Sequence, residues 1–205
     1  MIRIFVEGRD TNFLKVYIKH LQDNETLPNT INVQIDDIGG YTKLHLSANL
    51  FKENTDTSGT NLLIFDADSA ENNGGYQVRS DYLTAKKAEL GIDFEQFLFP
   101  NNADEGDFET LLENIINEAH RGMWNCFMGY ETCVNGFTNE DGTHKYKTPI
   151  RKSRVFAYID AFPKSRSADK KFRRNKDFFF ENSDYWNLDA AYLEPLKAFL
   201  ILHIR

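Results

Sequence analysis

The feature of the sequence that most limits its fold is the uninterrupted apolar run Leu-Leu-Ile-Phe at residues 62–65. A strand that is apolar at every position is typical of a parallel sheet covered on both faces. The run stops at Asp66-Ala67-Asp68, so two acidic residues follow the strand directly. Ligands of open α/β sheets bind at the carboxyl ends of the strands. Asp66 and Asp68 are therefore the first candidates for a functional site.

Strand and helix patterns alternate over the first hundred residues. Residues 2–6 have a strand pattern, and residues 13–21 then carry apolar side chains at helical spacing. The same kinds of pattern predict four further elements: a strand at 31–35, helices near 44–51 and 81–90, and a strand at 97–99 that Pro100 ends. This order predicts an α/β fold with a mostly parallel central sheet flanked by helices.

The rest of the chain has a mainly helical pattern. Apolar residues between Phe108 and Ile116 recur as one stripe of a helix, and residues 188–204 have the pattern of a closing helix with Pro195 near its start. We therefore expect an α/β core over residues 1–119. A mainly helical C-terminal extension over residues 120–205 is expected to pack on this core.

Composition excludes several classes of protein. The 205 residues are 41% hydrophobic and 27% charged, which is enough for a substantial core and too apolar for general disorder. No segment approaches the roughly 20 apolar residues of a membrane span, and the chain starts with a strand pattern rather than a signal peptide. We expect a cytoplasmic protein without membrane association. Cys126 and Cys133 suggest neither a disulfide framework nor a zinc site, and we expect both to be buried.

Positive charge is concentrated in one segment of an acidic chain. Between Lys145 and Lys176 there are 12 lysines or arginines and two acids, a net charge of +10, whereas the remaining residues sum to −17. The segment is either a solvated basic loop or a phosphate-binding surface. If it binds nucleic acid, the candidate contacts are Lys170, Lys171, Arg173 and Arg174. Aromatic residues are interleaved with these charges, as in many nucleic-acid-binding surfaces.

Glu7 joins the two aspartates as a candidate site residue because it follows the first predicted strand. Carboxylates that meet at one sheet edge repel each other unless a proton or cation lies among them, and oxygen ligands suit Mg²⁺ or Mn²⁺. Any one of these acids could instead be an ordinary loop or cap residue. The five histidines show no spacing typical of metal ligands, and the chain contains no phosphate-binding P-loop motif.

Two short motifs resemble those of the Toprim domain, which topoisomerases, primases and OLD-family nucleases share. They are Val6-Glu7-Gly8 after the first strand and Ile64-Phe65-Asp66-Ala67-Asp68. The segment from Gly106 to Leu112, and C-terminal segments at 154–158 and 193–200, resemble small uncharacterised bacterial Toprim-related proteins. One difference is Thr11, because relatives often carry an acid four residues after the glutamate; Asp10 lies one residue earlier.

The resemblance implies that Glu7 binds metal or acts as a general acid or base, and that Asp66 and Asp68 bind the metal. Glu109 could complete a second metal site, or it could be an exposed acid favoured by a helix start.

We therefore expect a Mg²⁺-dependent, nuclease-like phosphodiesterase acting on DNA or RNA. The alternative is a non-catalytic Toprim-like module that binds nucleic acid or a protein. OLD-type proteins join such a domain to an ATPase, so a separate ATPase is a candidate partner. A primase-like nucleotidyl transferase is less favoured, because no separate nucleotide-binding motif is present.

Overall fold

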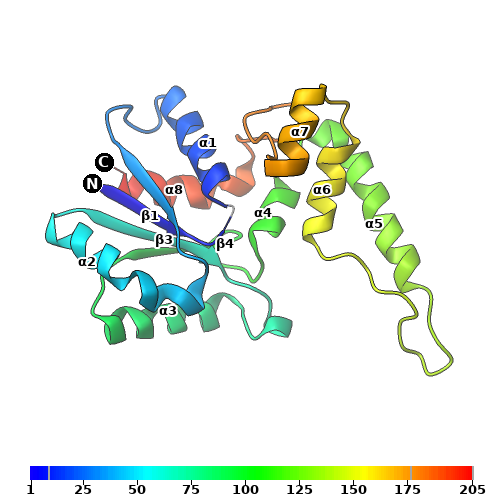
Figure 1. Ribbon diagram of the computed structural model, residues 1–205, viewed down its shortest axis with the longest axis horizontal. Helices are drawn as coiled ribbons and strands as arrows, with labels where there is room; N and C mark the ends of the chain where they lie inside the picture. The colour runs from blue at the N-terminus through cyan, green and yellow to red at the C-terminus, as the bar shows by residue number, and fades with distance from the viewer. Residues whose placement is uncertain (9, 176, 205) are drawn as a thin grey trace. The chain divides into compact units, whose positions relative to one another are not determined.

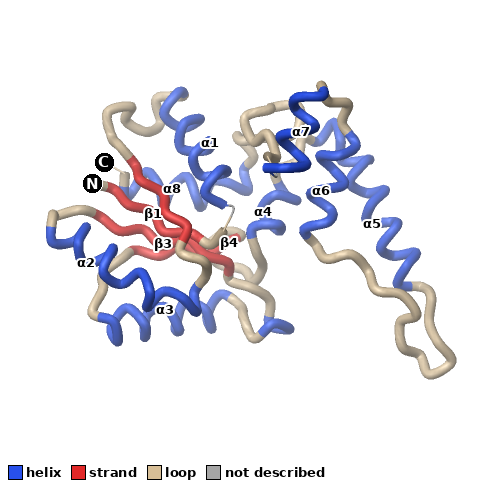
Figure 2. Tube along the Cα trace, viewed as in Figure 1, coloured by secondary structure: helices blue, strands red, loops and turns tan. Residues whose placement is uncertain are grey.

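Four parallel strands form the central sheet of the protein, in the order β2-β1-β3-β4 (Figures 1 and 2). The structure is a computed structural model that describes residues 1–8, 10–175 and 177–204. The strands are β1 (Ile2–Val6), β2 (Val33–Asp37), β3 (Thr60–Asp66) and β4 (Glu95–Phe99). The predicted α/β class with a parallel sheet flanked by helices is confirmed.

The chain divides into two compact units, one of residues 1–115 with the segment from Leu188 onward, the other of residues 116–187. The predicted division into residues 1–119 and 120–205 differs from this, mainly at the C-terminus. The last helix, α8 (Glu194–His203), belongs to the unit that contains the sheet, where the Phe199 ring lies 5.4 Å from the Phe97 ring of β4. Helices do make up the C-terminal part of the chain, as the sequence predicts.

Helices cover both faces of the sheet because the side chains of each strand alternate between two apolar layers (Figure 1). On one face, Phe5 stacks on Phe51 of α2 (Ala48–Asp56) with 3.7 Å between the ring centroids, and Leu83 of α3 (Tyr76–Leu90) joins the same core. On the other face lie α1 (Asp10–Asp23), α4 (Phe108–Asn114) and α8. Three short 3₁₀ helices complete this unit: Tyr41–Ser47, Ala70–Asn72 and Ala191–Leu193.

The second unit is helical and has an aromatic core. Its elements are a 3₁₀ turn (Glu118–His120), α5 (Arg121–Asn135), α6 (Lys152–Ala161) and α7 (Arg166–Asn175). The ring of Tyr158 contacts those of Trp124 and Trp186, and its hydroxyl donates to the carbonyl oxygen of Tyr185 at 2.7 Å. Burial raises the pKa of Tyr158 to about 12. These contacts show that the unit has a core of its own.

An ion pair between α5 and α6 extends the sequence prediction for this unit, and the exposure of its two cysteines corrects it. Glu131 of α5 is buried and accepts hydrogen bonds from Arg154 of α6 at 2.7–2.9 Å, which ties the two helices together. Cys126 and Cys133 are exposed on α5, so the expectation that both thiols are buried is wrong. The reason is that the apolar side chains that α5 buries, such as Trp124, lie on a different face of the helix.

Candidate functional site

Glu7 and Asp66 lie at the same edge of the sheet. β1 and β3 are adjacent and parallel, with Val6 opposite Ile64; Glu7 follows β1 directly and Asp66 is the last residue of β3. The strand pattern of the sequence predicts this placement. The carboxyl edge of the sheet is where an open α/β fold leaves room for a ligand.

Asp66 is the residue at this edge on which the charges of three neighbouring acids act. Its carboxylate accepts a hydrogen bond from the Phe108 N–H at 2.8 Å. Burial raises the pKa of Asp66 well above its ordinary value, and the negative charges of Asp107, Glu109 and Glu7 raise it further. The bond from Phe108 acts in the opposite direction without cancelling the increase. A proton or a cation at Asp66 would therefore be stabilised.

The start of α4 supplies two further acids to this edge. Asp107 caps α4: its carboxylate accepts from the Thr110 N–H at 2.8 Å and from the Thr110 hydroxyl at 2.7 Å. Glu109, which the sequence marks as a second-site candidate, is half-buried and acts on the pKa of Asp66. Sequence reasoning missed Asp107. The Asp-x-x-Thr capping pattern after a strand would have placed it at a helix start beside the sheet.

The position of Glu7 depends on tight backbone turns next to it. Gly8 has φ +66° and its N–H donates to Asp37 at the end of β2, with a distance of 2.8 Å. A Cβ atom at Gly40, where φ is +98°, would lie only 2.8 Å from a carboxylate oxygen of Glu7. The Glu7 carboxylate therefore lies directly against the backbone at Gly40, and only glycine leaves room for it there.

Asp68 is placed differently from the other predicted site residues. It has φ +60°, and its carbonyl oxygen accepts from the Gly106 N–H at 2.9 Å. Its carboxylate accepts a hydrogen bond from Arg79 of α3. The Arg79 side chain is only 3% exposed, its guanidinium carbon lies 3.3 Å from the centroid of the Tyr41 ring, and its Nε atom has no hydrogen-bond partner among the described residues. Asp68 thus already has a cationic partner within the protein.

The structure brings Glu7 and Glu109 into the electrostatic surroundings of Asp66, adds Asp107, and pairs Asp68 with Arg79. Carboxylate oxygens are the donors that Mg²⁺ and Mn²⁺ prefer, and the raised pKa of Asp66 suits a cation. Across residues 1–8, 10–175 and 177–204, however, no three His, Cys, Asp or Glu side chains are arranged so as to hold a metal ion. Mg²⁺ usually keeps several waters and is held by one or two carboxylates, and Asp66 and Glu7 are the two that this edge offers.

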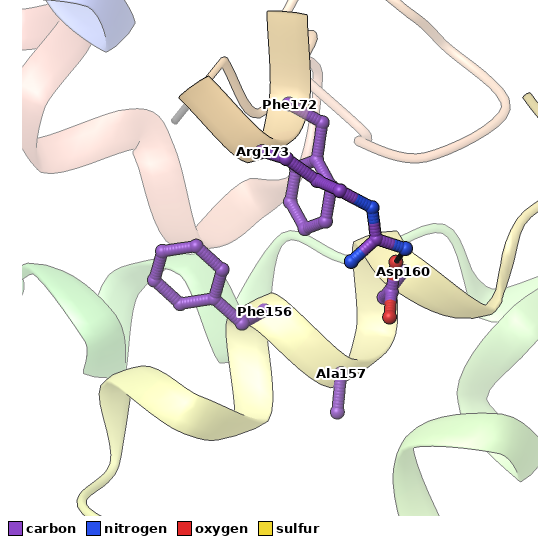
Figure 3. Close-up of a pocket in the computed structure, with 5 residues that line it drawn as sticks. All are labelled: Phe156, Ala157, Asp160, Phe172 and Arg173. Atoms are coloured by element: carbon purple, nitrogen blue, oxygen red, sulfur yellow. Dashed lines mark hydrogen bonds and ion pairs between the residues drawn. The ribbon is translucent and has the colours of Figure 1, made fainter. Parts of the chain in front are cut away.

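The basic segment lies in the second unit, on α6, α7 and the residues before them; its last residue, Lys176, is outside the described part. Lys170, Lys171 and Arg174 of α7 are exposed. Arg173 differs, because its guanidinium forms an ion pair at 3.0 Å with Asp160, as Figure 3 shows, and another at 3.0 Å with Asp169. A cavity of about 270 Å³ beside this ion pair is lined by Phe156, Ala157 and Phe172. Arg173 therefore joins α6 to α7, and the other three cations project from α7.

The fold and the site define an α/β protein with a parallel sheet that carries a carboxylate cluster at its carboxyl edge. The chain belongs to the family described as Protein of unknown function (DUF3226), whose family model matches residues 1–202. Comparisons with curated proteins and with solved structures gave no significant match. Among the described residues, no helix is both long and apolar enough to cross a membrane.

Proposed function

We propose that this protein is a Toprim-like, Mg²⁺- or Mn²⁺-dependent phosphodiesterase that acts on nucleic acid as a nuclease. The observation that carries the proposal is the position of Glu7 and Asp66 at the ends of adjacent parallel strands, with Asp66 half-buried among further acids. Such a cluster is costly in the absence of a cation and is stabilised by one. Its place at the sheet edge matches the two motifs that resemble the Toprim domain.

In this proposal Asp66 and Glu7 would hold the metal ion, which would supply positive charge for the phosphate and lower the pKa of a water molecule. Glu7, half-buried against the backbone of Gly40, also accepts the proton of the attacking water. Glu109 would be a ligand of a second metal ion. Asp68 orients the loop after β3 through its pairing with Arg79, and exchanges that partner only when it binds the ion itself.

The pairing of Asp68 with Arg79 also supports the second candidate function, a non-catalytic Toprim-like module that binds nucleic acid or a separate ATPase. An aspartate that is neutralised by a buried arginine is a weaker ligand for a divalent cation. Thr11 also favours the non-catalytic module, because relatives often have an acid at this position. In this candidate the acidic edge holds a structural ion and cleaves no substrate.

The two functions are separated by incubating the purified protein with labelled single-stranded DNA, duplex DNA and RNA in Mg²⁺, Mn²⁺ or EDTA. The enzyme proposal predicts cleavage in either metal and none in EDTA, and loss of cleavage in Glu7→Gln and Asp66→Asn. Glu53→Gln, an exposed acid on α2, is the matched control and should cleave normally. Metal-dependent cleavage that survives both site substitutions would show a contaminating nuclease and would reject the proposal.

A further inference from the structure

Exposed aromatic side chains are confined to one short stretch of the second unit. The chain has 17 phenylalanines, nine tyrosines and two tryptophans. Of those within the described residues, only Tyr130, Phe137 and Tyr146 are exposed, at 52%, 50% and 51%. The other aromatic rings are buried or half-buried. Large exposed apolar side chains gathered in one place indicate an interaction surface.

The rings of Phe137 and Tyr146 are displayed by an ordered hairpin. An antiparallel bridge joins Thr138 to His144, the Asn139 N–H donates to the Thr143 carbonyl at 2.8 Å, and the Lys145 N–H donates to the Phe137 carbonyl at 2.8 Å. The Phe137 and Tyr146 rings meet edge to face with 5.5 Å between their centroids. The stretch of chain that carries them extends beyond the end of α5, as Figure 1 shows. Both rings therefore keep an exposed surface without being part of a flexible tail.

Two lysines lie beside these rings, and two exposed acids, Glu140 and Asp141, lie in the turn of the hairpin. The Lys145 ammonium lies 5.7 Å from the centroid of the Tyr146 ring, and Lys147 is exposed one residue beyond it. The two lysines begin the segment of net charge +10 in a chain that is otherwise acidic. Aromatic rings supply stacking surfaces and lysines neutralise phosphates, and this combination is what single-stranded nucleic acid requires.

We infer that the hairpin of residues 137–146, together with Lys147, binds single-stranded nucleic acid by stacking bases on Phe137 and Tyr146. The inference rests on the proposed action on nucleic acid and specifies the form of the strand. In a duplex the faces of the bases are covered by their neighbours, so they cannot stack on protein rings. An apolar protein partner is the competing occupant, but it would not account for the lysines beside the rings.

The test is fluorescence anisotropy with a labelled 20-nucleotide oligo(dT) and a duplex of equal length, in EDTA at several salt concentrations. Phe137→Leu and Tyr146→Leu keep apolar bulk but remove the ring, and each should weaken single-strand binding by roughly tenfold at every salt concentration. In both variants the slope of the logarithm of the binding constant against the logarithm of the salt concentration should not change. The double variant Lys145→Gln, Lys147→Gln should instead reduce the magnitude of this slope by about 1.4, because each phosphate that is no longer neutralised lowers it by about 0.7.

Two controls keep this test interpretable. Leu46→Ser and Val78→Ser change apolar residues of the first unit that are 71% and 57% exposed, and neither should have an effect. Equal binding of single strands and duplex by the wild type, or unchanged binding by both leucine variants, would overturn the inference. Because binding is measured in EDTA, it is independent of cleavage. Single-strand binding without metal-dependent cleavage would reject the proposed enzyme and support this inference. Metal-dependent cleavage without single-strand binding would reject this inference and support the proposed enzyme.

Discussion

The two units of the molecule hold their charges in opposite ways. In the unit with the sheet, acids gather around the half-buried Asp66 and raise its pKa. In the helical unit, the cations of α7 lie on the surface, and the half-buried Arg154 is paired with the buried Glu131. A half-buried cluster of like charge is maintained at a cost to stability, whereas exposed cations cost little. This difference is why the proposed chemistry is assigned to the first unit and the proposed nucleic-acid binding to the second.

The largest expected effect is on catalysis. Glu7→Gln and Asp66→Asn should each reduce metal-dependent cleavage by on the order of 100-fold or more, because each removes a ligand worth several kcal/mol in the transition state. Oligonucleotide affinity in EDTA should stay unchanged in both variants, since the binding surface is assigned to the other unit. If both variants lost cleavage and binding together, the assignment of cleavage to the first unit and of binding to the second would be wrong.

The next effect concerns the ion pair beside the cluster. Arg79→Met should lower the free energy of unfolding by about 2 kcal/mol, because it leaves the partly buried Asp68 without its cationic partner. Urea unfolding would measure this. Lys86→Met removes the half-buried partner of the exposed Glu89 on the same helix and should change stability much less. Equal losses in the two variants would mean that the Arg79 pair is an ordinary surface ion pair.

A smaller effect distinguishes the four basic residues of α7. Replacing Lys170, Lys171 and Arg174 together by Ser should reduce the magnitude of the log-log salt slope for nucleic-acid binding by roughly 2 to 3. Arg173→Ser should change the slope less than the average of those three, because its guanidinium is already bonded to Asp160 and Asp169. If Arg173→Ser reduces the slope by more than a third of the reduction in the triple variant, that ion pair must open on binding.

The smallest effect is on stability as a function of pH. The pKa of Asp66 is higher in the folded protein than in the unfolded chain, so near pH 3, where both states are protonated, Asp66→Asn should melt like the wild type. As the pH rises above the ordinary carboxyl pKa of about 3.9, the unfolded chain releases its proton more readily, and the wild type loses stability relative to the variant. In EDTA at pH 7 the variant should therefore melt a few degrees higher, since about 1 kcal/mol shifts the Tm of a chain of this size by about 2–4 °C. A lower Tm for Asp66→Asn would contradict the raised pKa.

Much of the fold could be predicted from the sequence because its periodicity is local. The apolar run at 62–65 and the alternation of strand and helix patterns indicated the order of elements, and the strand ends then placed Glu7 and Asp66 at one edge. The C-terminal division could not be predicted in this way. Nothing local in residues 188–204 shows that Phe199 packs on Phe97 of the sheet.

The fine structure of the site was also beyond sequence reasoning, for a physical reason. Asp66 and Asp68 look equivalent in the motif, but the left-handed turn at Asp68 directs its carboxylate to Arg79, which comes from a helix that starts eight residues later. Asp107 reaches Asp66 only because α4 starts beside β3, with the Phe108 N–H on the Asp66 carboxylate. Such contacts depend on how elements pack, which the spacing of residues does not encode.

The most direct test of the central claim is a calorimetric titration of the protein with Mg²⁺ and Mn²⁺. The account predicts that the wild type binds these ions and that Asp66→Asn and Glu7→Gln each weaken binding by at least about tenfold, whereas Glu53→Gln has no effect. Asp68→Asn should weaken binding less than either site variant, because Asp68 is paired with Arg79. A wild type that binds neither ion, or affinities that are unchanged in both site variants, would contradict the assignment of a metal site to the carboxyl edge of the sheet.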